Sequence, residues 1–301
     1  MRRANRSLRH QVSESNDQTL FLERSKTVNL PKKTSLPFFA YGLFKPRQLC
    51  YSRIKELVRE TKEGTVGGRL KERDGMPLLV SNPNDTVRGH LIYFHAGKED
   101  EAYNRIMEIE PEEVYRWDTI RVDDQVDANV LLGRKEGRGS FDIEHCEEWD
   151  GRSDPFFNQG LQEVEDILKA NPHFKPDYKP LFRLHMAYSL LWSAIERYTG
   201  LKYHLGTKVN QKVYQIAGEK CFAASLKDNV KGKREVFSAA DLGKCVLDPE
   251  DPERSIRYYY QVRSNAAHRG KAVHGDFQTL KSSLEELLAI FRDVLKSAFD
   301  D

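Results

Sequence analysis

The sequence predicts an α+β protein in two parts, a small barrel-like domain of short strands followed by an all-α helical bundle. From Leu36 to about Arg138, short aromatic and β-branched runs are separated by Gly, Pro, Asn and Asp turns, as in strands. After Asp154, apolar residues recur at helical spacing instead. A chain of 301 residues also favours about two domains.

The first domain is expected to span residues 36–138. Its predicted strands, in order, are residues 38–44, 65–70, 76–80, 87–94, 115–122 and 127–133. Helices are expected at 46–60 and 98–110. Because strands outnumber helices and each is short, they indicate a small barrel with flanking helices.

Two segments outside these domains have a different composition. Residues 1–35 are basic and polar with no apolar core, which predicts a flexible arm and excludes a secretory signal peptide. Such an arm is either an ordinary tail or a contact to nucleic acid. Residues 139–153 are charged and Gly-rich, and are the expected linker.

The second domain is expected to span residues 154–301. Helices are predicted at 160–171, 182–200, 211–225, 255–270 and 276–299. Gly200 is the expected C-cap of the second helix and Asp276 the expected N-cap of the last. The second helix should bury a stripe of apolar residues at helical spacing: Leu184, Tyr188, Leu191, Ile195 and Tyr198.

The bulk composition narrows the class of protein. The net charge is +2, so any nucleic-acid site must be local. The four cysteines are far apart and form no CxxC pair, which predicts reduced thiols in the cytoplasm and no metal or other cofactor. No apolar run reaches the length of a membrane span, so no membrane partner is expected.

The stretch YGLFKP follows the first predicted strand. A glycine there lets the chain turn tightly and expose backbone N–H groups, which can bind a ligand carboxylate. Taken alone, the stretch also fits a plain strand-to-helix turn. The order of the later segments, GTVGGRLKERDGMPLLV, VRGHLIYF, RIMEIEPEEVYRWDTIRV and DANVLLG, adds weight to a binding loop.

This series of segments resembles the gamma-glutamylcyclotransferase-like (AIG2-like) family over about 100 residues. The resemblance implies a small β-barrel and cyclisation of a γ-glutamyl amine to 5-oxoproline. Tyr41, Gly42 and Leu43 match the loop that holds the substrate carboxylate, and Glu110 matches the general acid/base. Tyr115 matches a tyrosine that follows the catalytic glutamate. One carboxyl with a raised pKa serves both the attacking and the leaving amine.

The sequence departs from this family at several positions. Arg47 stands where glycine is usual after the loop proline, Met107 stands where an aspartate is frequent, and Pro111 stands where glycine follows the glutamate. Glu110 also lies among other acidic residues, as at a solvated helix end. A pocket adapted to sense a small γ-glutamyl-like ligand or to bind a protein partner is therefore the alternative to catalysis.

A second candidate site is the stretch QVRSNAAHRG, in which Arg263 and His268 lie five residues apart. On one regular helix this spacing leaves them roughly 140° apart, so they do not face each other. A histidine and an arginine suffice for metal-free RNA cleavage, because the histidine transfers protons and the arginine stabilises the negative charge that develops on the phosphate. The products would carry 2′,3′-cyclic or 3′-phosphate and 5′-hydroxyl ends.

The helical half resembles HEPN domains, especially the Apea-like group, in which an R-x4-6-H motif forms a ribonuclease site. Arg263 and His268 match this pair, with Ser264 where a polar Asn, Asp or His is frequent and Asn265 one position later. Glu196 is a candidate supporting group. HEPN domains typically form homodimers that bring two motifs to one cleft, which would resolve the 140° separation.

Residues near the motif suit RNA binding. Arg269 and Lys271 flank it and are expected to contact phosphates, and the run Tyr258–Tyr260 suits either base stacking or packing in the core. The sequence therefore predicts a homodimeric endoribonuclease controlled by the first domain, as in a toxin or phage-defence system. The alternatives are a cyclotransferase whose helices only dimerise or bind RNA, and a noncatalytic HEPN protein in which Arg263 braces the bundle.

Overall fold

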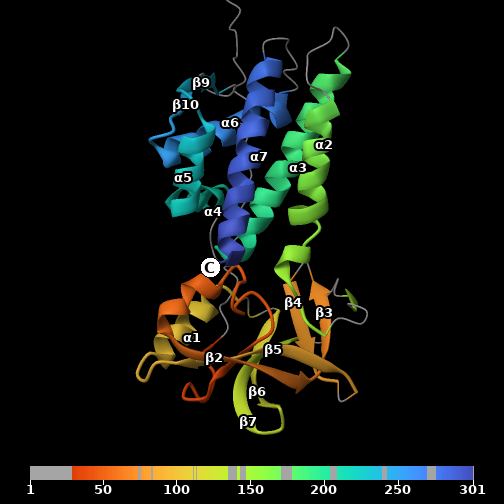
Figure 1. The fold of residues 1–301 in the computed structure, drawn as a ribbon, viewed down its shortest axis with the longest axis vertical. Coiled ribbons are helices and arrows are strands. Elements are labelled where there is room, and N and C mark those ends of the chain that lie inside the picture. The colour runs from red at the N-terminus through yellow and green to blue at the C-terminus, as the bar shows by residue number, and fades with distance from the viewer. Residues whose placement is uncertain are drawn as a thin grey trace, which may run out of the picture.

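The computed structural model describes residues 29–73, 76–82, 84–110, 112, 114–134, 141–142, 147–170, 178–203, 209–238, 243–269 and 276–300. Strands occupy the N-terminal part and long helices the C-terminal part (Figure 1). The α+β class predicted from the sequence is confirmed. Residues 1–28 of the expected arm lie outside the described residues.

The N-terminal part contains two sheets. The larger has the order β2-β5-β1-β7-β6, built from Val58–Gly67, Thr86–Phe94, Phe38–Ala40, Val126–Gly133 and Tyr115–Val122. Its pairings are antiparallel except between β1 and β7. The smaller has the order β4-β3-β8, built from Met76–Val80, Arg69–Arg73 and Phe141–Asp142.

The larger sheet curls so that its two edge strands approach each other. The turn after β6 meets β2, where the Asp123 carboxylate accepts hydrogen bonds from the Thr65 N–H (2.9 Å) and hydroxyl (2.7 Å). In return the Asp123 N–H donates to the Thr65 carbonyl at 3.0 Å. Among the described strands, however, β2 and β6 form no ladder, so the pairing is that of an open, curled sheet.

The prediction of one of the two helices in this half is wrong. Residues 46–60 form only two short 3₁₀ turns, η2 (Tyr51–Arg53) and η3 (Lys55–Leu57), and β2 begins at Val58. Pairing of β2 with β5 supplies hydrogen bonds that override the local helical pattern. The other expected helix is confirmed as α1 (Glu99–Met107).

The C-terminal part is built on long helices. α2 (Leu161–Ala170), α3 (Lys179–Lys202) and α7 (Asp276–Asp300) run side by side, with α4 (Val209–Gln215), α5 (Lys220–Asn229) and α6 (Pro252–Arg269) beside them (Figure 1). The predicted apolar stripe of α3 is confirmed as core, each member being at most 1% exposed. Gly200 does not end α3, which continues to Lys202.

The prediction of an all-α second half is wrong in one respect. β9 (Arg234–Phe237) and β10 (Lys244–Leu247) form an antiparallel hairpin between α5 and α6. Each strand has only four residues, too few for a clear alternating pattern. After β10 the Ser255 hydroxyl accepts from the Asp248 N–H and donates to the Asp248 carbonyl, which fixes the start of α6.

The two halves are packed against each other through the last residues of the expected linker. A Cβ at Gly151 would lie 2.8 Å from Trp149 and 3.2 Å from Phe299, so only glycine allows this close approach. Arg152 donates to the carbonyl of Phe299 in α7. The Cys50 thiol lies 3.5 Å from the Leu201 carbonyl of α3.

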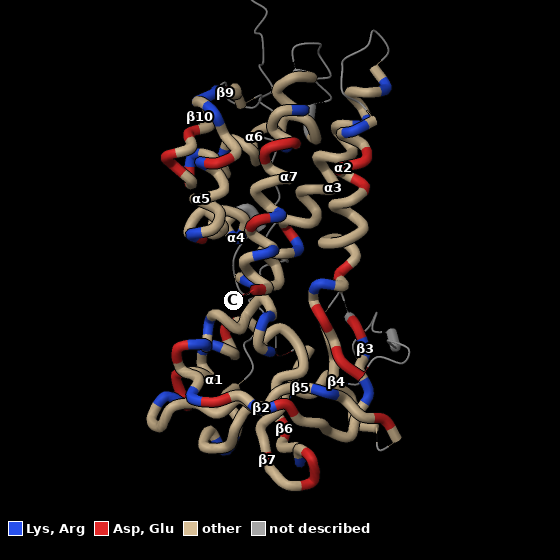
Figure 2. Tube along the Cα trace, in the orientation of Figure 1, with Lys and Arg blue, Asp and Glu red and all other residues tan. Residues whose placement is uncertain are grey.

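Acidic and basic residues are interspersed over both halves of the described chain (Figure 2). None of the helices in that part of the chain has the length and apolar character needed to cross a membrane.

Candidate functional site

The five residues predicted for the N-terminal site come together around one small pocket. Tyr41, Gly42 and Leu43 follow β1, Glu110 follows α1, and Tyr115 begins β6, and all five line the same cavity. The rest of the wall is apolar apart from backbone groups and is formed by Phe38, Ala40, Phe44, Pro77 and Leu131. Residues up to 74 positions apart in the sequence thus line one cavity.

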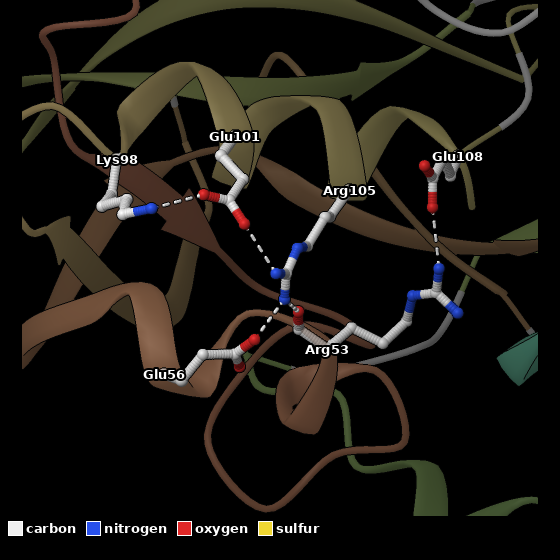
Figure 3. A network of polar contacts seen from close by, with 6 residues as sticks. All are labelled: Arg53, Glu56, Lys98, Glu101, Arg105 and Glu108. Carbon is white, nitrogen blue, oxygen red and sulfur yellow. Dashed lines mark hydrogen bonds and ion pairs between the residues drawn. The ribbon is translucent and has the colours of Figure 1, made fainter.

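Glu110 is positioned by α1, and α1 is held by a network of charged side chains (Figure 3). Arg105 pairs with Glu101 one turn earlier at 2.7 Å and with Glu56 of η3, and it donates to the Arg53 carbonyl at 2.7 Å. Arg53 in turn pairs with Glu108 at 2.9 Å. These contacts anchor the C-terminal end of α1 to the 3₁₀ turns and so fix where the chain enters the pocket.

Glu110 is a buried carboxyl without a charged partner in the described structure. Its side chain is 6% exposed, and its Oε2 has no hydrogen-bond partner among the described residues. Burial raises the pKa of Glu110 to about 8. A carboxyl of this kind is neutral at neutral pH and is able both to donate and to accept a proton, as general acid/base catalysis requires.

The two tyrosines hold the wall of the pocket through their hydroxyl groups. The Tyr41 hydroxyl donates to the Leu131 carbonyl at 2.6 Å, and the Tyr115 hydroxyl donates to the Pro77 carbonyl at 2.8 Å. Both side chains are at most 5% exposed. Burial raises the pKa of Tyr41, so the phenol is a neutral donor. The geometry assigns both residues to shaping the pocket.

The loop after β1 lines the pocket with Gly42, Leu43 and Phe44. Within the described part of the chain, the N–H groups of Gly42, Leu43 and Phe44 have no hydrogen-bond acceptor. A Cβ at Gly42 would lie 2.7 Å from Cγ of Pro77, so the close approach requires glycine. The cavity volume of about 20 Å³ holds about one water molecule. A γ-glutamyl ligand would therefore have to displace wall residues on binding.

Arg47 adopts a backbone conformation suited to the glycine usual at its position. Its φ is 62°, in the left-handed region that side chains other than glycine disfavour. The chain thus keeps the turn while departing from the residue type. Of the other departures, Met107 ends α1, and Pro111 lies outside the described residues.

The C-terminal candidate site lies on α6, which runs without interruption from Pro252 to Arg269. Arg263 and His268 therefore belong to one helix, and the roughly 140° between them is a property of the fold. Arg269 is the last residue of α6. The side chains of His268 and Arg269, and all of Lys271, lie outside the described residues.

Arg263 is half-buried and faces α3. Its Nη2 lies 3.4 Å from Glu196 Oε1, and its guanidinium lies 5.8 Å from the centre of the Tyr260 ring. Glu196 is the supporting residue proposed from the sequence. Because both side chains are 28% exposed and the contact is long, the pair is weak.

Asn265 lies on another face of α6 and has a structural role. Its side chain donates to the Phe237 carbonyl of β9 and accepts from Gln261, both at 2.8 Å. It lines a cavity of about 40 Å³ together with His185 of α3, a histidine that the sequence pattern did not single out. Of the three tyrosines in α6, Tyr258 and Tyr259 belong to the core, and Tyr260 is partly buried.

Other polar groups became apparent only in three dimensions. Lys45 is 3% exposed and pairs at 2.6 Å with Glu148, beside the N-terminal pocket. In the described part of the chain, no group of three or more His, Cys, Asp or Glu side chains is arranged to hold a metal ion.

No protein-family profile and no curated protein sequence matches the chain. Two solved structures are similar to part of the chain. One, an uncharacterised protein from Pyrococcus horikoshii, is 17% identical with a TM-score of 0.30 and covers 36% of this chain and 86% of its own. The other, a protein from Arabidopsis thaliana, is 14% identical with a TM-score of 0.27 and covers 47% and 91%.

Proposed function

We propose that the protein is a metal-independent endoribonuclease that acts as a homodimer through a HEPN-like helical half. The N-terminal half would be a cyclotransferase-like domain of the small-barrel type that controls the cleavage. The protein would work in the cytoplasm, as an effector of a toxin or phage-defence system. The continuity of α6 is the observation that carries this proposal.

Because α6 is unbroken, one chain presents Arg263 and His268 on different faces. A second chain related by two-fold symmetry would bring its own α6 to the same cleft. Arg263 of one subunit would then work with His268 of the other. The weak pairing of Arg263 with Glu196 leaves the guanidinium free to turn to a phosphate.

The proposed reaction is an internal phosphoryl transfer within RNA. The 2′-oxygen attacks the adjacent phosphorus while the bond to the 5′-oxygen breaks, and His268 accepts the 2′-hydroxyl proton. The departing 5′-oxygen takes a proton from water, and the protonated His268 returns its proton to the hydroxide that is left. Arg263 stabilises the charge that grows on the phosphate oxygens. The 2′,3′-cyclic phosphate product requires no further reactant.

The direct test is cleavage of single-stranded RNA by the full chain and by Arg263→Ala and His268→Ala variants. We expect each variant to lose at least about a hundredfold in rate, with a 5′-hydroxyl at every cut made by the wild type. Arg254→Ala is the matched control, because Arg254 lies on the same helix and pairs with Asp251. Unchanged cleavage by both site variants would refute the proposal.

Mixing the two inactive variants tests the sharing of the site. If the arginine and the histidine come from different subunits, a mixed dimer has one intact site and one site lacking both groups. At equal concentrations, about half of the dimers are mixed, so about a quarter of the wild-type rate should return. No recovery after the subunits have exchanged would exclude this arrangement.

A second function is favoured by the environment of Glu110. Within the described part of the chain, the pocket joins a buried, unpaired carboxyl to a loop whose N–H groups have no acceptor, and γ-glutamyl cyclisation requires both parts. The α-amine would attack the γ-carbonyl carbon, Glu110 would pass the amine proton to the leaving amine, and 5-oxoproline would be released. The helical half would then only dimerise or bind RNA.

Release of 5-oxoproline from γ-glutamyl amines and dipeptides measures this second activity. We expect Glu110→Gln to abolish any release by the wild type and to leave RNA cleavage intact. If the wild type releases nothing but a γ-glutamyl compound raises its melting temperature, the pocket is a sensor. The absence of both effects would remove γ-glutamyl compounds as ligands.

A further inference from the structure

The helical half contains a groove that belongs to neither of the candidate sites. It lies between α4, the short turn η6 (Ile216–Gly218) and the first turns of α6. Its volume of about 560 Å³ is within the range of sites that hold small organic molecules. The lining residues are Tyr203, Gln211, Tyr214, Gln215, Ala217, Gly218, Glu219, Glu253 and Arg257.

One wall of the groove is a stack of a cation on an aromatic ring. The Arg257 guanidinium lies 4.5 Å from the centre of the Tyr214 ring. Tyr214 meets Tyr260 edge-on at 5.8 Å, and Arg263 lies 5.8 Å from the same Tyr260 ring. The groove is therefore joined to the candidate catalytic arginine through two aromatic rings, and planar π-faces of this kind stack nucleobases.

The charged groups of the groove differ in whether they already form hydrogen bonds or ion pairs within the protein. Glu219 accepts hydrogen bonds from the Tyr198 hydroxyl at 2.9 Å and from Lys202 at 3.0 Å, so its charge is balanced. Glu253 and Arg257, one turn apart on α6, are exposed and have no ion-pair partner among the described residues. The groove thus offers one free carboxylate and one free guanidinium beside a ring.

The amide side chains of Gln211 and Gln215 complete the polar edge from the opposite helix. They are one turn apart on α4 and both are exposed. Each amide has a donor and an acceptor end, so either one can adapt to the edge of a planar heterocycle.

We propose that this groove binds a nucleobase of single-stranded RNA and prefers guanine. The inference rests on the proposed action on RNA and adds the base that is recognised. Guanine presents the acceptors O6 and N7 to an arginine and the donors of N1 and N2 to a carboxylate. Adenine presents a donor where guanine has O6, and the pyrimidines lack the N7 acceptor. Only guanine satisfies Arg257 and Glu253 together.

The position of the groove fits a base next to the bond that is cut. Arg257 and Arg263 are six residues apart on α6, a rise of about 9 Å along the helix axis. A base stacked on Tyr214 would place the neighbouring phosphates of its strand beside Arg263. The groove would then select where the ribonuclease site acts.

The test uses the full chain with His268→Ala to prevent cleavage. Fluorescence anisotropy measures its binding to labelled uridine-rich RNA octamers that carry a single central guanosine or adenosine. We expect about tenfold tighter binding of the guanosine octamer, and competition by guanosine 5′-monophosphate but not by adenosine 5′-monophosphate. Tyr214→Ala and Arg257→Ala should each weaken binding about tenfold, and Glu253→Gln should remove the preference.

Two matched variants are controls for a general loss of positive charge and for a loss of folded structure. Tyr214→Phe keeps the ring and should bind as the parent protein does. Arg254→Ala removes an exposed arginine three residues from Arg257 and outside the groove lining, and should change affinity less than twofold. Equal losses in Arg254→Ala and Arg257→Ala, or equal binding of the two octamers, would overturn the assignment.

The outcomes separate this inference from the proposed ribonuclease. Cleavage that depends on His268 but ignores Tyr214, Arg257 and Glu253 would refute the groove assignment alone. Guanine-selective binding through the groove without cleavage by the wild type would refute the ribonuclease alone. A chain that neither binds nor cuts RNA refutes both.

Discussion

Lys45, in the loop that forms the N-terminal pocket, is paired at 2.6 Å with Glu148, in the segment that leads into the helical half. Two residues further on, the Asp150 carboxylate accepts from Gln48 of the same loop at 3.0 Å. Gln48 also accepts from the Gly151 N–H at 3.0 Å. The pocket loop is thus bonded directly to the segment whose Arg152 contacts the end of α7. A ligand that moved this loop would move the junction.

The pair of Lys45 and Glu148 predicts an asymmetric effect of two neighbouring substitutions. Glu148→Gln leaves the buried Lys45 ammonium without its counter-ion and should lower the free energy of unfolding by about 1–3 kcal/mol. Glu147 pairs with Arg88, but both are more than half exposed, so Glu147→Gln should cost less than about 0.5 kcal/mol. Urea unfolding measures both effects, and equal effects would contradict the burial of the Lys45 ammonium.

The buried carboxyl of Glu110 predicts how stability changes with pH. Its pKa is about 8 in the folded protein against an ordinary value of 4.5, so between these values the folded state holds the proton more tightly. The unfolded state is therefore increasingly favoured as the pH rises from 4.5 to 8, by up to about 1.4 kcal/mol per pH unit from this group.

Glu110→Gln removes that contribution because the amide does not titrate. The variant should gain stability relative to the wild type between pH 5 and pH 8 when urea unfolding of both is measured across this range. A difference between the two proteins that stays constant with pH would show that Glu110 is not a buried, unpaired acid.

The fit of Gly42 against Pro77 predicts the effect of adding one methyl group. Gly42→Ala would place a Cβ 2.7 Å from the proline ring and should destabilise the fold by about 1–3 kcal/mol while closing the pocket. Gly218→Ala is the control, because an added Cβ there meets nothing within 4 Å. Thermal unfolding of both variants tests this packing, and equal melting temperatures would show that the loop is not packed tightly against Pro77.

The left-handed backbone at Arg47 predicts a stabilising substitution. Arg47→Gly relieves a residue at φ 62° and should raise the free energy of unfolding by about 0.5–1 kcal/mol. Asp123 has φ 49°, but its carboxylate also accepts two hydrogen bonds from Thr65. Asp123→Gly should therefore destabilise. Chemical unfolding of the two variants should give shifts of opposite sign.

Much of the secondary structure could be predicted from local patterns. Alternation and turn residues located most strands of the first half, and the apolar spacing of Leu184, Tyr188 and Leu191 identified the buried face of α3. The β9–β10 hairpin and the strand start at Val58 could not be predicted in this way. The start of β2 depends on pairing with β5, which is distant in the sequence, and the four-residue strands β9 and β10 carry little signal of their own.

The features of the candidate sites also fall into two groups, those that the sequence determined and those that depended on the tertiary structure. The sequence by itself determined which residue types stand at Tyr41, Glu110, Arg263 and His268, and the helical spacing that separates the last two. Only the tertiary structure decided that Glu110 is buried, with its Oε2 unpartnered among the described residues, and that α4 faces α6 across a groove. The physical reason is that a pKa, a cavity and a stacked pair depend on which atoms exclude water around a group, and those atoms come from elements far apart in the chain.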